Sequence, residues 1–414
     1  MKKSLIASAI AVSLAAPAMA QQVTISGFFN ASYDYNGISQ QNASRVGRLN
    51  ESRITDNSSR IIFGVSEDLG GGMRAIGQFD LRVAMDAMQP IHTGQGLSGA
   101  LAANTPAVNV ANGGNNHIGL VTPVGTFRLG RQDIQYVENA GFMPVGLATI
   151  ASHAGVFHQV GARTMTGASR TPNLAWWVSP RWNGVQATLG YSTNPGSNSS
   201  IATQSENDLA KTGNGSRVGS GTYIKLDAAV GKLGLVYSQV DMKPDYTGTQ
   251  QTAGAGGTAA AATGDWTGNT MADEKGKVLT AKYDLGGGWN IGLGFSRNQT
   301  EAVLTGVQTK QSGSQIGLGY STGAHVIGFL MTNMGDRKLS TTGTATATGV
   351  KAHTLAYGYN LSKRTQLHAS YVVMDNDANA NTGLFYNAVT VMGNASALNG
   401  EKHSAYSLGV RHSF

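Results

Sequence analysis

An apolar residue followed by a polar or small one is the recurring pattern of this chain. The clearest case is residues 59–81, SRIIFGVSEDLGGGMRAIGQFDL, in which two alternating runs flank three glycines. In the second run one face carries Met73, Ala75, Gly77, Phe79 and Leu81, and the other carries Arg74, Ile76, Gln78, Asp80 and Arg82. A period of two is that of a β-strand, and the glycines predict a tight turn. We therefore expect a β-hairpin with one apolar face and one largely polar face.

The same alternation returns along the rest of the chain. With the hairpin it predicts sixteen strands, which begin near residues 23, 60, 73, 116, 126, 173, 185, 222, 233, 279, 289, 316, 324, 355, 367 and 406. Short turns (EDLGGG, TPVG, DLGGG, YNLSKR) alternate with long connections. This all-β pattern is typical of an antiparallel transmembrane barrel with short periplasmic turns, long external loops, an apolar outside and a wet inside. In a soluble sandwich the same apolar faces would cover a core.

The start of the chain favours the barrel. Lys2 and Lys3 precede an apolar run over residues 5–16, and the small-residue pattern AMA follows, as in a secretory signal peptide. We expect residues 1–20 to be removed and residues 21–414 to form one domain, because no linker or change in composition marks a boundary. No later run of 18 apolar residues occurs, so only a closed barrel could cross a bilayer.

Composition excludes several function classes. The 414 residues include 56 glycines and no cysteine, and the formal net charge is +7. Losing Lys2 and Lys3 lowers this charge by two, to +5, and no Lys/Arg run occurs, which argues against nucleic-acid binding. The absence of cysteine excludes thiolate metal sites and cysteine nucleophiles, and it fits an exported protein that does not depend on disulfides.

Catalytic motifs are also missing. His153 and His158 are five residues apart in a predicted loop, and neither HExxH nor GxSxG occurs. Ser370 and His368 share a strand face, but no third group is predicted to orient them. The two glycine triplets lead into neither a helical pattern nor GK[ST], so they are interpreted as turns. These observations favour a polar channel lining over an enzyme.

One external segment has the spacing of a calcium loop, without the usual bidentate glutamate. Its alternating residues are Asp375, Asp377, Asn379, Asn381 and Gly383. A solvated loop is the favoured interpretation and calcium the alternative, and no other cofactor is expected. Residues 248–268 and 340–349, rich in glycine, alanine and threonine, are expected to be mobile loop tips.

Four stretches carry a resemblance to a known family: SRIIFGVSEDLGGGMRAIGQF, PVGTFRLGRQ, YNLSKRTQLHASY and SLGVRHSF. They resemble, in order, signature stretches of the Gram-negative general porins, in particular the beta-proteobacterial branch. The resemblance implies a 16-stranded barrel, a homotrimer in the cell outer membrane among lipopolysaccharide, and a third external loop, residues 132–169, folded into the lumen as a constriction. It also implies that Phe414 is the terminal aromatic read by the barrel assembly machinery.

The resemblance also implies a set of constriction residues. Arg60 of the SR motif, Arg131 of the LGRQ motif and Arg170 correspond to family arginines, whereas Trp176 stands where the family tends to have an arginine. Adjacent strand residues point to opposite sides. We therefore expect Trp176 to face the lumen, narrow it and offer planar solutes a stacking surface, and Trp177 to face outward.

Arg131 is the exception to the alternation. Counting from Phe127 and Leu129, it would point toward lipid, where an arginine near the bilayer midplane costs about 2–4 kcal/mol. A bulge at Gly130 would re-aim it inward. An arginine at the barrel rim that snorkels to the headgroups is the alternative.

The sequence thus predicts a passive channel for small hydrophilic solutes and ions that prefers anions. A basic wall raises the local anion concentration in a narrow, low-dielectric throat. The predicted wall residues are Arg60, Arg131 and Arg170 with inward Arg74, Arg82 and Arg128, and the acids of the loop are Asp133 and Glu138. The alternatives are a substrate-selective porin for organic acids or other small nutrients and, more remotely, an adhesin or receptor that uses the long loops, or a barrel hydrolase.

Overall fold

The computed structural model describes residues 22–46, 49–83, 85, 114–134, 139–142, 149–160, 163–164, 170–195, 219–243, 272–302, 306–386, 389–390 and 398–414. The expected signal segment, residues 1–20, lies outside these residues. No helix in the described part is long and apolar enough to cross a bilayer.

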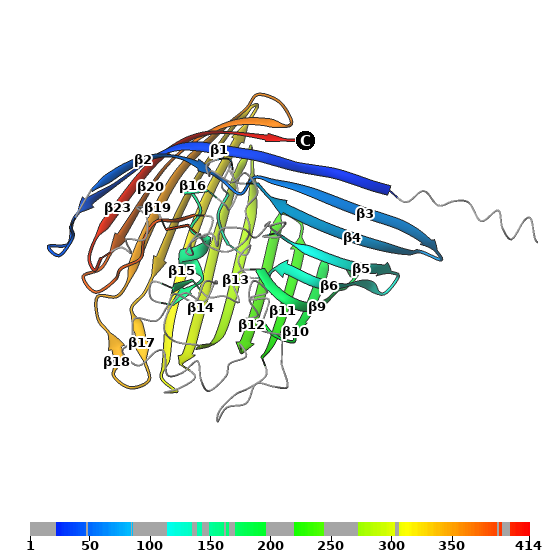
Figure 1. Ribbon diagram of the computed structural model, residues 1–414, viewed down its shortest axis with the longest axis horizontal. Coiled ribbons are helices and arrows are strands. Elements are labelled where there is room, and N and C mark those ends of the chain that lie inside the picture. Colours follow the sequence, from blue (N-terminus) through cyan, green and yellow to red (C-terminus); the bar gives the residue numbers. More distant parts are fainter. Residues whose placement is uncertain are drawn as a thin grey trace, which may run out of the picture.

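Sixteen antiparallel strands close into one barrel, which confirms the predicted fold (Figure 1). In ring order they are β1 (Gln22–Gln40), β3 (Arg60–Gly70), β4 (Met73–Arg82), β5 (Asn116–Thr122), β6 (Gly125–Asp133), β9 (Arg170–Val178), β10 (Val185–Ser192), β11 (Ser220–Val230), β12 (Leu233–Lys243), β13 (Ala272–Gly286), β14 (Trp289–Ala302), β15 (Gln308–Thr322), β16 (His325–Met334), β19 (Val350–Asn360), β20 (Thr365–Asn376) and β23 (Lys402–Ser413). The remaining described elements are short: β2 (Asn50–Asp56), α2 (Ala154–Phe157), β7 (Gln159–Val160), β8 (Arg163–Thr164), β17 (Arg337–Leu339), β18 (Gly343–Ala345), β21 (Phe385–Tyr386) and β22 (Val389–Thr390).

The two faces of the wall differ as the alternation predicts. On β14, Leu293 and Phe295 point outward and are 45% and 58% exposed, whereas Ser296 and Asn298 on the inner face are 5% and 0% exposed. Apolar side chains therefore cover the outside of the barrel, where lipid would solvate them.

The seam of the barrel joins the two ends of the described chain. In Figure 1 the blue strand β1 lies beside the red strand β23. The N–H of Gly27 donates to the carbonyl of Phe414 at 3.3 Å, and the N–H of Phe414 donates to the carbonyl of Gly27 at 3.1 Å. Gly27 has φ +157°, and a Cβ there would collide with the carbonyl oxygen of Arg60, so only glycine fits this crossing.

Strand β3 continues the line of β2 after a break at residues 57–59. The first half of β1 pairs with β3, and its second half pairs with β2. At the break Ser58 has φ +64°, and the N–H of Ser59 donates to the carboxylate of Asp56 at 3.1 Å. The break leaves Arg60 as the first residue of β3, on the inner face opposite Phe28.

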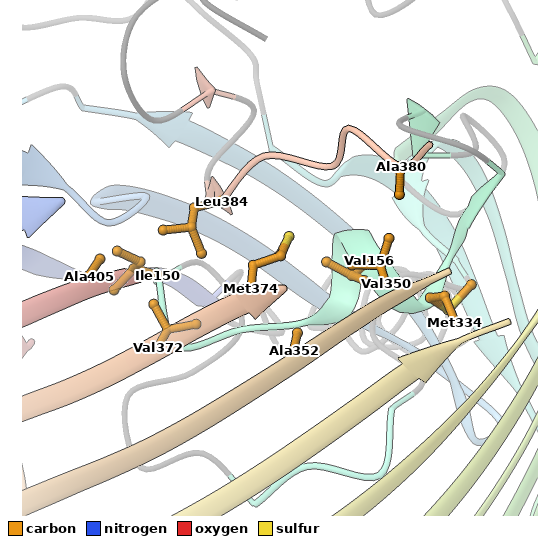
Figure 2. Close-up of a cluster of buried hydrophobic side chains, with 10 residues drawn as sticks. All are labelled: Ile150, Val156, Met334, Val350, Ala352, Val372, Met374, Ala380, Leu384 and Ala405. Carbon is orange, nitrogen blue, oxygen red and sulfur yellow. The ribbon is translucent and has the colours of Figure 1, made fainter. Parts of the chain in front are cut away.

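The buried apolar core lies inside the barrel, between the third external loop and the wall. One cluster joins Ile150 and Val156 of the loop to the inner face of β16, β19, β20 and β23 (Figure 2). A second joins Ile134 and Val160 to the inner face of β9, β11 and β12. The lumen is thus dry where the loop is anchored, and the predicted wet interior is restricted to the remaining inner surface.

Candidate functional site: the pore constriction

The third external loop, between β6 and β9, crosses the barrel interior and hydrogen-bonds to the far wall. Among its described residues, the N–H of Ala140 donates to Gln315 Oε1 at 3.0 Å. The side-chain amide of Asn298 donates to the carbonyls of Phe157 and Gln159 at 3.1 and 3.2 Å. These contacts are made by β14 and β15, so the predicted infolded loop is present.

Glycines make room for the loop on that wall. The inner faces of β14 and β15 carry Gly292, Gly294, Gly317 and Gly319. A Cβ at Gly319 would lie 2.8 Å from Phe142 Cβ, one at Gly294 would lie 3.2 Å from Phe157 Cζ, and one at Gly317 would collide with the carbonyl oxygen of Ala140. We call these four residues the glycine track, which lets the loop lie directly on the backbone of the wall.

His153 fixes the middle of the loop between two strands. Its Nδ1 lies 3.0 Å from Thr332 Oγ1 and its Nε2 lies 2.7 Å from Thr354 Oγ1. Burial, with a smaller contribution from the charge of His353, lowers the pKa of His153 to about 3. The imidazole is therefore neutral at physiological pH, and its two hydrogen bonds hold the loop against β16 and β19.

Across the lumen from the loop anchor, Arg60 and Arg82 share one carboxylate. Arg60 Nη1 lies 3.5 Å from Asp80 Oδ2, and Arg82 Nε lies 3.2 Å from Asp80 Oδ1. The backbone N–H of Asn115 also donates to Asp80 Oδ2 at 3.3 Å. Asp80 is 1% exposed, so its charge acts mainly on the two arginines beside it.

We call the inward-facing Arg60, Arg82, Arg128, Arg170 and Arg411 the arginine wall. Arg170 is paired with Asp133. Their closest atoms, Arg170 Nε and Asp133 Oδ1, are 3.8 Å apart. Asp133 was expected in the infolded loop, but it is the last residue of β6, directly opposite Arg170 in the register. The strand continues this far because the pairing with β9 resumes beyond the irregularity at Gly130.

That irregularity lies directly beside Arg131. The β6–β9 register shifts between Gly130 and Gln132, and Gly130 has φ +147°. This is the bulge expected at Gly130. It is confined to the β9 side, because the β5–β6 register continues unshifted through Arg131, and the inward direction of Arg131 therefore stays a prediction. Arg131 is partly buried and pairs with Asn116 across β5.

Phe28 lies between two guanidinium groups on the same wall. Arg60 Cζ is 4.7 Å from the centre of its ring and Arg411 Cζ is 4.2 Å from it. Such contacts hold a guanidinium over a ring face by cation–π attraction. Arg411, on β23, thereby joins the arginine wall at the seam.

The adjacent tryptophans of β9 lie on opposite faces. Trp176 pairs with Arg128 on the inner face, and Trp177 pairs with Phe127 on the outer face. Trp176 is 5% exposed and belongs to the buried cluster with Ile134, so it offers little surface for the expected stacking of solutes. The indole N–H of Trp177 donates to the carbonyl of Val124 at 3.0 Å, at a short turn.

The other expected site residues are placed as follows. Arg74 is directly opposite Asp68 in the β3–β4 register, on the inner face near the first short turn. Glu138 lies outside the described residues. Among the residues that the structure describes, no group of three His, Asp or Glu side chains could hold a metal ion, and Asp375 of the calcium candidate is paired with Lys402 at 3.4 Å on the outer face.

Three residues at this site were not singled out from the sequence: Arg411 of the arginine wall, and Phe28 and Asp80, which contact its arginines. The alternation did indicate an inward Asp80 and, counting from Leu408 and Val410, an inward Arg411. Their contacts with one another could not be predicted from the alternation, because they depend on which strands are neighbours in the barrel and on the register between them.

Comparisons with known proteins agree with this geometry. A family model described as Gram-negative porin matches residues 7–379. An anion-selective porin from Comamonas acidovorans superposes with a TM-score of 0.65 at 17% identity, over 95% of this chain and 100% of that one. The trimer form of in-vitro folded OmpT, an outer membrane protein of Vibrio cholerae, gives 0.60 at 13% identity, over 95% and 100%. No match was found among curated proteins.

Proposed function

The chain belongs to the Gram-negative porin family, and we propose that its arginine wall makes the channel anion-preferring. As a porin it is located in the outer membrane and forms a channel through the barrel. Passage is passive diffusion of small hydrophilic solutes and ions, without a catalytic step or a cofactor.

The observation that carries the proposal is the excess of positive charge on the described inner wall. The arginines are Arg60, Arg82, Arg128, Arg170 and Arg411, and the described carboxylates at ion-pair distance from them are Asp80 and Asp133. Within the described residues, Arg128 and Arg411 contact aromatic rings rather than carboxylates. Since this wall faces the infolded loop across the lumen, its field acts on the solute at the narrow passage. The similarity to an anion-selective porin supports the same preference.

Reversal potentials of single channels in a salt gradient test this proposal. Replacing Arg128 and Arg411 together by alanine should move the potential toward cation preference. The effect should shrink with ionic strength, because the Debye length falls from about 10 Å at 0.1 M to about 3 Å at 1 M. Lys363→Ala with Arg364→Ala, at the exposed β19–β20 turn, removes the same charge outside the lumen and should leave the potential unchanged. An unchanged potential in the wall variant at low salt would reject the assignment.

We propose further that the functional form is a homotrimer and that the barrel assembly machinery recognises Phe414. The similar OmpT structure is a trimer form, and Phe414 directly follows the last strand and bonds to Gly27 at the seam. Gel electrophoresis of unheated protein, which preserves stable trimers, tests the first statement.

A further inference from the structure

A segment of the last external loop packs against the third external loop. The last external loop joins β20 to β23, and along its residues 380–384 buried side chains alternate with partly exposed ones. Ala380, Thr382 and Leu384 are the buried ones, and each is at most 4% exposed. Since an extended backbone points alternate side chains to opposite sides, one side of this segment is packed against other parts of the protein. We call residues 380–384 the brace segment.

The brace segment packs against the middle of the third loop. Ala380 and Leu384 belong to the buried cluster of Figure 2. Ile150 and Val156 of the third loop are in the same cluster, and Figure 2 shows them between Ala380 and Leu384 above and the strands of the wall below. The third loop is therefore enclosed from two sides, by the wall and by the last external loop.

A buried hydrogen bond also joins the two loops. Gln159 Nε2 donates to Thr382 Oγ1 at 3.0 Å, and both residues are buried. Moving the loops apart would leave a buried amide without its partner, which costs more free energy than an exposed hydrogen bond contributes. The bond therefore favours one position of the third loop relative to the brace segment.

The brace segment is itself fixed to both ends of its loop. The side-chain amide of Asn376, the last residue of β20, donates to the carbonyl of Thr382 at 2.9 Å and accepts from the N–H of Thr382 at 2.8 Å. The same amide donates to the carbonyl of Glu401 at 2.8 Å, and the N–H of Gly400 donates to the carbonyl of Ala380 at 2.9 Å. The brace segment is thus a fixed part of the barrel against which the third loop rests.

We propose that the brace segment positions the constriction, with Thr382 and Leu384 as its positioning residues. The third loop is held on its wall side by the hydrogen bonds of His153 and by its seat on the glycine track. The brace segment holds the opposite side. Without it the middle of the third loop would lift from the wall into the passage from time to time, and the current through the open channel would fluctuate.

A cysteine introduced into the third loop measures how often the loop lifts. The chain has no cysteine, and Ser152→Cys adds one at a position that is 8% exposed. In this background Leu384→Ala should speed modification by a soluble thiol reagent at least about tenfold, because removing a buried leucine side chain weakens the contact between the loops. The variance of the open-channel current in planar bilayers should rise with it.

Thr382→Val is a milder second variant. It keeps the shape of the side chain and removes the hydroxyl that accepts from Gln159, so it should speed modification of the cysteine several-fold. If Leu384→Ala does not fold, this variant decides the test. Neither substitution changes a charge, so the result is independent of the ion preference proposed above.

Leu398→Ala is the matched control. Leu398 belongs to the same loop and is partly buried, but it is not part of the buried cluster, so its modification rate and current variance should equal those of the Ser152→Cys background. Unchanged rates and variance in the folded brace variants would overturn the proposal, and so would an equal effect in Leu398→Ala. Lower resistance of the barrel to unfolding in SDS without faster modification would also overturn it, because the segment would then stabilise the barrel without positioning the loop.

Discussion

Asp80 is the buried acid that opposes the arginine wall, since it lies between Arg60 and Arg82. Asp80→Asn removes one negative charge while keeping the size of the side chain. We therefore expect stronger anion preference in a salt gradient at about 0.1 M salt, with a smaller effect at 1 M.

The matched control is Asp375→Asn, which makes the same change on the outer face, where Asp375 pairs with Lys402. Its reversal potential should equal that of the unchanged channel. A shift of the reversal potential toward cation preference in Asp80→Asn would contradict this prediction. It would show that Asp80 mainly holds the arginines in place, rather than reducing their effect on anions through its charge.

Trp176 and Trp177 allow a comparison of neighbouring positions. Trp176→Ala should cost about 3–5 kcal/mol of unfolding free energy, because it leaves a cavity in the buried cluster around Ile134. Trp177→Ala should cost less, since Trp177 lies on the outer face and bonds to the turn at Val124. Urea unfolding in lipid vesicles measures both, and equal losses would contradict the assignment of the two faces.

These residues also mark the limit of sequence reasoning at this scale. Alternation and resemblance placed Trp176 inward and Trp177 outward, as the register has them. They did not show that Trp176 would be covered, because its covering residues include Tyr223 and Met242 from strands later in the chain. The direction of a side chain follows from the local strand pattern, whereas its burial depends on side chains that other strands pack against it.

Among the elements, the contact between the infolded loop and the glycine track has a direct test. Gly317→Val places a side chain where the backbone of Ala140 lies, so the loop must move off the wall. Strands β14 and β15 lie halfway round the ring from β4 and β5. The displaced loop therefore narrows the passage, and we expect a lower single-channel conductance.

Gly234→Val is the matched control for this prediction. Gly234 is also on the inner face, and a Cβ there would have no neighbour closer than 3.9 Å. Its conductance should be unchanged. If both variants conduct like the original channel, the loop is not seated by the glycines.

Regular strands were predictable because their side chains alternate with a period of two along the whole strand. Irregular connections have no such period and were not predictable. Residues 340–349 were expected to be a mobile tip, yet the structure has β18 there, paired with β17. The N–H of Thr348 donates to Asp336 Oδ1 at 2.7 Å, which ties the end of this loop to its start. The prediction of a mobile tip overlooked hydrogen bonds between polar side chains and the backbone, which need no apolar core.

At the scale of the whole molecule, an ion pair links the first and last external loops. Arg45 donates to both carboxylate oxygens of Glu401, at 2.5 Å for Nη2–Oε2. Burial alone would raise the pKa of Glu401, but hydrogen bonds from Arg45 and from the N–H groups of Leu398 and Asn42 lower it to about 2. The stabilisation should therefore be complete above the ordinary value of about 4.5 and be lost as the pH falls through about 2.

Glu401→Gln tests this link. Protease protection of the two loops should be lower in the variant than in the unchanged protein at pH 5 to 7, and the difference should vanish toward pH 2. A difference that grows as the pH falls would have the wrong sign for a carboxylate with a lowered pKa.

Deleting Phe414 should lower the yield of barrel in the outer membrane without changing the conductance of channels that do assemble. The deletion removes both hydrogen bonds with Gly27 and the ring that lies 5.3 Å from Phe29. Phe414→Tyr keeps the ring and the backbone bonds and should assemble normally. Quantified heat-modifiable protein in membrane fractions gives the comparison.

The seam between β1 and β23 also sets an order of events in time. Most wall pairings join strands that follow each other closely in the chain, but Phe28 pairs with Ser413. A contact of such high sequence separation forms slowly, since the entropy of closing its loop must be lost before the contact stabilises anything. Until it forms, β1 and β23 both present open edges that invite aggregation. The folding protein is thus most prone to aggregation just before the barrel closes, when the curved sheet is formed but β1 and β23 are not yet paired.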